Sequence, residues 1–173
     1  MIKECNLVEF FSGIGSQAKA LKNLGIKVNT VGTCEWDVHA IAAYDMIHNS
    51  PEIPDDISAM EKEELLEKLA PYTFSNSGKA ALDTASFRTY SREVLQHIYA
   101  SITRNHNFVD ISGLSGDKLS GNIDILTYSF PCQDLSNVGA FHGYNKGIGS
   151  SSPLEQSTCM LPTMDNRRCL AFT

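Results

Sequence analysis

Residues 5–15 read Cys5-Asn6-Leu7-Val8-Glu9-Phe10-Phe11-Ser12-Gly13-Ile14-Gly15, and this stretch decides the fold. Its first seven residues predict a buried strand, and the next four predict a glycine turn. Apolar residues then recur at helical spacing until Gly25, which is a typical helix stop. A β-branched strand at 28–34 and a second helix at 38–47 follow. Strand–helix–strand–helix at this pitch predicts an α/β fold, a parallel sheet with flanking helices.

The segment 52–107 has a different character, and we interpret it as a helical insertion or an elaborated crossover. Residues 58–61 fit a capping box ahead of a leucine-rich helix that ends at Pro71. Residues 73–90 are rich in Ser, Thr, Asn and Gly and predict a loop. A further helix is expected through 94–102 because its apolar residues return at helical spacing.

Two more strands are expected after this segment, a short one at 108–112 and an apolar one at 123–130. In the strand order 3-2-1-4 the strand at 123–130 would lie at an apolar edge of the sheet. Periodicity is lost beyond Gly147. We therefore expect one partial catalytic and cofactor-binding domain at 1–147 and an atypical, disordered tail at 148–173.

Composition sets bounds on function. A formal net charge of −6 argues against a self-sufficient nucleic-acid binder, which usually carries a basic stripe. The amino terminus lacks the apolar core of a signal peptide, and apolar runs are only strand-sized, so a cytoplasmic protein is expected. Five cysteines without CxxC spacing indicate neither a disulfide framework nor a metal site, and Cys5 and Cys34 are expected to be buried.

Two features point to a nucleotide-like cofactor. Glycines at 13 and 15, between a strand and a helix, let the backbone approach a bound nucleoside. Glu35 follows twenty residues after Gly15, at the end of the next strand, where a carboxylate can accept hydrogen bonds from ribose hydroxyls. Trp36 could supply an apolar shelf for adenine or be a core aromatic residue. These features alone fit a nicotinamide dehydrogenase as well as a methyltransferase.

A thiol follows the last predicted strand, in Phe130-Pro131-Cys132-Gln133. Ligands bind at the carboxyl edge of open α/β sheets, and Pro131 stiffens the backbone beside the thiol. A thiol is intrinsically nucleophilic, and a nearby helix start would raise its thiolate fraction. From chemistry alone Cys132 is either a catalytic nucleophile or a buried structural cysteine.

Four motifs together resemble, in order, the first four motifs of the DNA (cytosine-5) methyltransferases. They are Glu9-Phe10-Phe11-Ser12-Gly13-Ile14-Gly15, Glu35-Trp36-Asp37, Asp110-Ile111, and Ser129-Phe130-Pro131-Cys132-Gln133-Asp134-Leu135-Ser136. The resemblance covers roughly residues 5–147. It implies a Rossmann-like methyltransferase fold that uses S-adenosylmethionine as cofactor. Its partners would be double-stranded DNA and, genetically, a cognate restriction endonuclease.

The resemblance also implies roles for residues of the first three motifs. Phe11 and the backbone of Gly13-Ile14-Gly15 would line the methionine and ribose portion of the cofactor. Glu35 would hold the ribose hydroxyls and Trp36 the adenine face. Asp110 would accept from the adenine amino group, with Ile111 packed beside it.

In the fourth motif, the resemblance makes Cys132 the nucleophile that attacks carbon-6 of a cytosine flipped out of the duplex. Pro131 would lie close to the cofactor and the target base. Gln133 and Ser136 would belong to a loop that closes over the DNA.

The sequence departs from the family after residue 147. Glu9 stands where Asp is usual, a mild change, but the later Glu-Asn-Val motif and a target-recognition region are missing. A truncated or frame-shifted reading frame would produce such a tail and could leave the chain inactive alone. The alternatives are a remnant that only binds cofactor, a tRNA cytosine-5 methyltransferase, and a nicotinamide oxidoreductase, which leaves Cys132 without a role.

Overall fold

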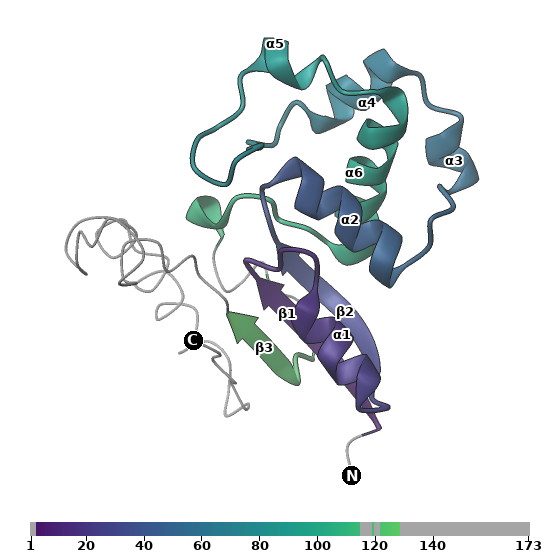
Figure 1. Ribbon diagram of the computed structural model, residues 1–173, viewed down its shortest axis with the longest axis vertical. Coiled ribbons are helices and arrows are strands. Elements are labelled where there is room, and N and C mark those ends of the chain that lie inside the picture. Colours follow the sequence, from purple (N-terminus) through teal and green to yellow (C-terminus); the bar gives the residue numbers. More distant parts are fainter. Residues whose placement is uncertain (1–2, 115–118, 120–121, 129–173) are drawn as a thin grey trace, which may run out of the picture.

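A computed structural model of the chain describes residues 3–114, 119 and 122–128 (Figure 1). In this part the sheet has three parallel strands in the order β2-β1-β3, with β1 at Glu4–Phe10, β2 at Lys27–Cys34 and β3 at Ile125–Tyr128. Phe10 of the central strand pairs with Cys34 and with Tyr128, so the strands end at one edge. The connection after β1 leads to β2 on one side, and the connection after β2 leads to β3 on the other side of β1. Open α/β sheets bind ligands at such a switch point.

Helix α1 (Ser16–Asn23) covers one face of the sheet, where Ala18 packs with Cys5 and Leu7. On the other face Val8 and Phe10 pack with residues of β3 and with the chain that precedes it. This alternation is the period of two expected for a strand that is buried on both sides. Gly25, with φ +77°, follows the last turn of α1, which confirms the predicted helix stop.

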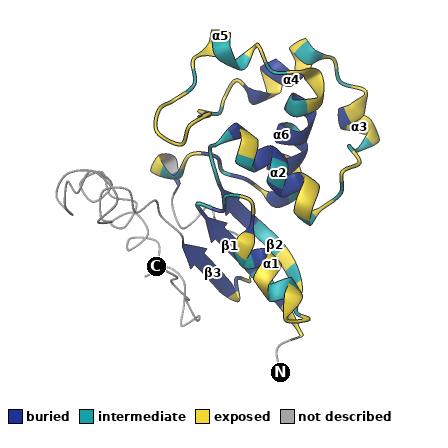
Figure 2. Ribbon diagram, viewed as in Figure 1, coloured by how far each residue is buried: buried dark blue, intermediate teal, exposed yellow. Residues whose placement is uncertain are grey.

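A layer of helices lies beyond the carboxyl ends of the strands (Figure 1). It consists of α2 (Val38–His48), α3 (Asp55–Ser58), α4 (Lys62–Leu69), α5 (Thr84–Phe87) and α6 (Arg92–Asn105). Buried residues concentrate in the strands and on the facing sides of α2 and α6 (Figure 2). One apolar core thus joins α2 to residues 52–107, the segment interpreted from sequence as an insertion or crossover. The end of α6 brings the chain back beside β2.

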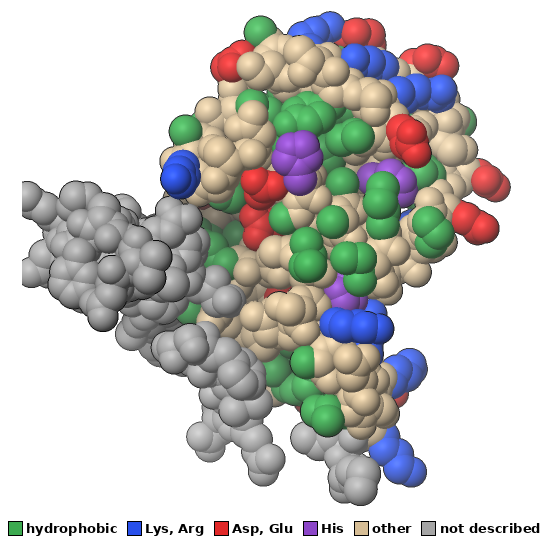
Figure 3. All heavy atoms as spheres, viewed as in Figure 1, with side chains coloured by type: hydrophobic (Ala, Val, Ile, Leu, Met, Phe, Trp, Pro, Cys, Tyr) green, Lys and Arg blue, Asp and Glu red, His purple; other side chains and the backbone are tan. Residues whose placement is uncertain are grey.

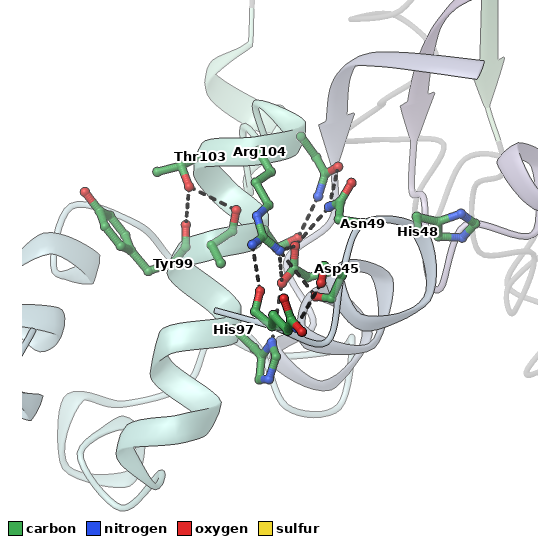
Figure 4. A network of polar contacts seen from close by, with 12 residues as sticks. Asp45, His48, Asn49, His97, Tyr99, Thr103 and Arg104 are labelled. Atoms are coloured by element: carbon green, nitrogen blue, oxygen red, sulfur yellow. Dashed lines mark hydrogen bonds and ion pairs between the residues drawn. The ribbon is translucent and has the colours of Figure 1, made fainter. Parts of the chain in front are cut away.

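A buried ionic network fastens α2 to α6 (Figure 4). The Asp45 carboxylate is fully buried, and Arg104 Nη1 lies 3.2 Å from each of its oxygens. His97 Nδ1 lies 3.4 Å from Oδ2, and Asn49 Nδ2 donates to Oδ1 at 2.9 Å. Removing one partner would leave the other charges buried and unpaired, which costs free energy. The network therefore fixes the spacing of the two helices.

Three expectations about local structure were wrong. Residues 108–112 form no strand: Val109 has φ +63°, and Ile111–Gly113 is a 3-10 turn, so only the Thr33–Asn107 bridge extends the sheet there. No capping box starts α4, because Ser58 ends α3 and its hydroxyl donates to Asp55 O. The loop predicted at 73–90 contains the short helix α5, which begins after the Asp83 cap.

The predicted strand at 123–130 corresponds to β3, which ends at Tyr128. Pro131, Cys132, Gln133, Ser136 and the tail at 148–173 lie outside the described residues, so the expectations about them stay predictions, as do the domain boundaries. Within the part of the chain that is described, no helix has the length and apolarity needed to span a membrane.

Candidate functional site

Glu35 is the centre of the candidate site, directly after β2. Its Oε1 accepts hydrogen bonds from the backbone N–H groups of Trp36 and Asp37, both at 2.9 Å. Its Oε2 accepts from the Gly13 N–H at 2.8 Å. A carboxylate offers about four lone-pair positions, so these three bonds fix its orientation and leave capacity for a further donor such as a hydroxyl. The structure therefore brings Glu35 and the glycine turn together.

The glycine turn owes its shape to left-handed backbone. Phe11 and Gly13 both have φ +53°, and Gly15 has φ +78°. The Gly15 N–H donates to Ser12 O at 2.8 Å and closes the turn. A Cβ on Gly15 would overlap the His48 ring and would lie 2.6 Å from Tyr44 Cε2, so only glycine fits there. The side chain of Ile14, by contrast, is 54% exposed at the tip of the turn.

Glu9 supports the turn from below, and sequence reasoning gave it no such role. It is fully buried; its Oε1 accepts from the Ala18 N–H at 3.1 Å and its Oε2 from the Tyr44 hydroxyl at 2.6 Å. Burial raises the pKa of Glu9, while the bonds from Tyr44 and Ala18 and the charge of Lys22 oppose the rise. Glu9 thereby ties β1 to the first turn of α1 and to α2.

The remaining predicted residues line the same edge of the sheet. Trp36 is half-buried and packs against the helical core, which leaves both of its sequence interpretations open. Ile111 is also half-buried and packs with the core cluster that contains Phe10 and Tyr128. Phe11 meets the Tyr128 ring edge-on, with 5.4 Å between ring centroids. Of the predicted cofactor residues, only Pro131 falls outside the described chain.

Asp110 is exposed, and its carboxylate accepts from Ser112, at 2.9 Å from the N–H and 2.7 Å from the hydroxyl. Both Asp110 and Glu35 act on the buried thiol of Cys34, whose pKa is raised by burial and further by these two carboxylates. Two acids therefore lie near one point at the edge of the sheet. Cys34 and Cys5 are buried free cysteines, as predicted.

Asn107 joins these parts, and the sequence analysis missed it. Its Oδ1 accepts from the N–H of Glu35 at 3.1 Å and from that of Val109 at 3.0 Å, and its Nδ2 donates to Glu35 O at 3.1 Å. A single buried amide therefore clamps the end of β2 to the segment that carries Asp110. Its place just after a long predicted helix was the only available signal.

Histidine, hydrophobic and some acidic side chains face the viewer over α2, whereas lysines and arginines lie both along α1 and at the opposite end of the molecule, over the helical layer (Figure 3). A separate hollow of about 300 Å³ lies between α4 and α5 and is lined in part by Leu66, Phe74 and Phe87. None of its lining residues belongs to the predicted site.

Comparison with known proteins supplies the family. The model of the C-5 cytosine-specific DNA methylase family matches residues 5–76 and 78–151. The chain is 36% identical over 156 residues to the orphan methyltransferase M.SssI of Spiroplasma monobiae, covering 88% of this chain and 40% of that protein. It is 30% identical over 158 residues to the type II methyltransferase M2.ScrFI of Lactococcus lactis subsp. cremoris, covering 88% of this chain and 42% of that protein.

A shorter match, 37% identical over 68 residues, relates the chain to the orphan methyltransferase M.Rho11sI of Bacillus phage rho11s and covers 38% of this chain and 14% of that protein. The chain spans about two fifths of the length of the first two relatives. With its parallel sheet and flanking helices, a Rossmann-like arrangement, the chain belongs to the C-5 cytosine-specific DNA methylase family.

Proposed function

We propose that this chain carries the S-adenosylmethionine site and the nucleophile of an enzyme that methylates carbon-5 of cytosine in DNA. The observation that carries the proposal is the use of the amides at the start of α1. The N–H groups of Gly13 and Ala18 donate to Glu35 and Glu9, and that of Gly15 donates to Ser12 O. All three N–H groups therefore donate to acceptors within the protein, and two of these acceptors are carboxylates.

This arrangement suits a cation better than a phosphate. A dinucleotide site needs free N–H groups at the helix start to hold its pyrophosphate. Here three amides between Gly13 and Ala18 are already bonded within the protein, and the turn sits beside Glu35 and Asp110, where a positively charged sulfonium would be stabilised. The same feature counts against the nicotinamide oxidoreductase, which the sequence alone left open.

Residues at this edge of the sheet would then contact different parts of the cofactor. Glu35 would accept from the ribose hydroxyls, and Phe11 with the backbone of residues 13–15 would line the ribose and methionine. Trp36 and Ile111 would flank the adenine, and Asp110 would accept from its amino group in place of the Ser112 donors. Pro131 would complete the pocket toward the base. The bound cofactor supplies an electrophilic methyl group.

The chemistry proposed for Cys132 follows from its thiol. The thiolate would add to carbon-6 of a flipped cytosine and make carbon-5 nucleophilic. Carbon-5 would then take the methyl group from the sulfonium, whose methyl–sulfur bond breaks to leave the thioether S-adenosylhomocysteine. Loss of the carbon-5 proton would expel the thiol and restore the double bond. Gln133 and Ser136 would contact the DNA from the loop after the nucleophile.

Cofactor binding is the first test. Isothermal titration with S-adenosylhomocysteine should show binding by the wild-type chain, and E35Q should weaken it at least about tenfold by losing one charge-assisted contact. E4Q is the matched control, since Glu4 is an exposed glutamate paired with Lys27 at the opposite end of the sheet. Binding of NAD in place of S-adenosylhomocysteine would refute the proposal.

Activity needs a separate test. With S-adenosylmethionine, DNA that contains 5-fluorocytosine should form a covalent adduct with the wild-type chain and none with C132S. Cofactor binding without an adduct would favour a remnant that only binds cofactor. An adduct with tRNA but not with DNA would favour the tRNA enzyme.

The setting of the reaction is also a proposal. Relatives named type II methyltransferase support a restriction-modification system with a cognate endonuclease, whereas those named orphan support a methyltransferase without one. An endonuclease gene beside this one, whose product is blocked by the methylation, would decide for the former.

A further inference from the structure

His48 closes α2 directly beneath the glycine turn. Its Nε2 lies 2.9 Å from Ile14 O, and its ring takes the space that a side chain on residue 15 would need. Tyr44, one helical turn earlier, lies beside it with 4.5 Å between ring centroids. Figure 4 shows His48 directed away from His97 and Arg104, so it is not part of the network that joins α2 to α6. The turn thus rests on an aromatic pair of α2.

The partners of the ring select one protonation state. A carbonyl oxygen only accepts, so the bond to Ile14 requires the hydrogen on Nε2. Nδ1 then carries a lone pair, and it lies 3.3 Å from the Lys22 ammonium, which also donates to His48 O at 3.2 Å. The neutral ring satisfies both neighbours. A second proton would place an N–H on Nδ1 against the ammonium group.

The charges around the ring act in the same direction. Lys22 and Lys19 of α1 act on the ring through their charges, and Tyr44 beside it on the same helix stays neutral. The buried Glu9 accepts from the Tyr44 hydroxyl and interacts with the Lys22 charge. Burial first, and then the two lysines, lower the pKa of His48, although its bonds to the turn oppose the shift. The folded turn therefore favours the neutral form of the His48 ring.

We propose that His48 is a positioning residue of the cofactor site, whose neutral ring holds the Ile14–Gly15 backbone in its binding geometry, so that acidification weakens cofactor binding. This inference rests on the proposed function, since residues 13–15 are assigned to the cofactor there. An ordinary histidine titrates near about 6.5, and the pKa of His48 is lower, so binding should weaken only as the pH falls below that range. An ordinary histidine that must stay neutral would weaken binding by at most about tenfold at pH 5.5, and the loss for His48 is smaller than that.

The experiment measures the Kd of S-adenosylhomocysteine at pH 7.5 and pH 5.5 for four chains. The wild type should weaken measurably, by less than about tenfold, between the two values. H48Q keeps an N–H for Ile14 and an acceptor for Lys22 but cannot be protonated, so it should bind nearly as well as the wild type at pH 7.5 and lose this pH dependence. H48A should bind more weakly at both values. H39Q, at an exposed histidine of the same helix, should behave as the wild type.

A second readout separates this inference from the proposed function. Amide hydrogen exchange of residues 13–15, corrected for the intrinsic rate, should accelerate at pH 5.5 in the wild type and in H39Q but not in H48Q. If no chain binds S-adenosylhomocysteine while this pattern is present, the cofactor assignment fails and with it the effect of His48 on cofactor binding. If H48Q keeps the wild-type pH dependence of binding and exchange, or H48A binds normally, His48 does not position the turn.

Discussion

Replacing Asn107 by alanine should show whether one amide sets the geometry of the site. Its side chain satisfies three backbone groups, the N–H and C=O of Glu35 and the N–H of Val109. Asn107 is only 5% exposed, so water cannot readily replace it. An unsatisfied buried polar group costs about 1–3 kcal/mol, and the half-buried Glu35 backbone relaxes toward water, so we expect about 3 kcal/mol in total.

Urea unfolding followed by the fluorescence of Trp36, the sole tryptophan, gives the free energy of unfolding. Asn29 offers the control: it is exposed and donates to Asn6 Oδ1 at 2.9 Å on the surface, and N29A should cost within about 0.5 kcal/mol. Under conditions where N107A is still folded, its Kd for S-adenosylhomocysteine should rise about tenfold, because Glu35 is no longer fixed. Equal stability of N107A and N29A, or unchanged cofactor affinity in N107A, would refute the reasoning.

Three further perturbations follow from the same contacts. G15A should lower the free energy of unfolding by about 2–4 kcal/mol through ring overlap and positive φ, whereas G78A, with φ +67° and open space, should cost about 1 kcal/mol in the same urea titration. D45A should cost about 3–5 kcal/mol because it strands the Arg104 charge, and a shift in Tm no larger than that of an exposed Asp→Ala variant would contradict this. The raised pKa of Glu9 means that its ionisation opposes folding. The wild type should therefore lose stability relative to E9Q as the pH rises above about 4.5. A difference in the free energy of unfolding that stays constant from pH 4 to 8 would exclude this.

Local patterns predicted much of the fold. The apolar run in β1, the stop at Gly25 and the helical periods of α2 and α6 are each set by neighbours in sequence. The expectation failed at 108–112 because Asn107, which is held by Glu35 72 residues away, takes the Val109 N–H. Val109 adopts φ +63°, and Asp110 then caps a 3-10 turn. Apolar character alone could not predict that tertiary override of strand propensity.

The candidate site shows the same division. Glu35 and the glycine turn could be proposed from sequence because a strand–turn–helix–strand unit sets their spacing, and in the structure the Gly13 N–H donates to Glu35. Asn107 and His48 could not, because each acts on residues that lie 72 and 34 positions away in sequence. Their types are ordinary for the end of a helix, so only the packing of α2 and α6 gives them a role.

These contacts make the helical layer part of the site. The end of α6 fixes Glu35 through Asn107, and the end of α2 supports the glycine turn through His48. The spacing between these two helix ends is held by Asp45 and Arg104 within a shared apolar core. A change in that spacing would move the Glu35 carboxylate relative to the Gly13 N–H, a bond of only 2.8 Å. Buried ionic groups contribute little net stability compared with apolar packing. We infer that the network serves instead to fix the relative position of α2 and α6, the two helices whose ends contact the candidate site.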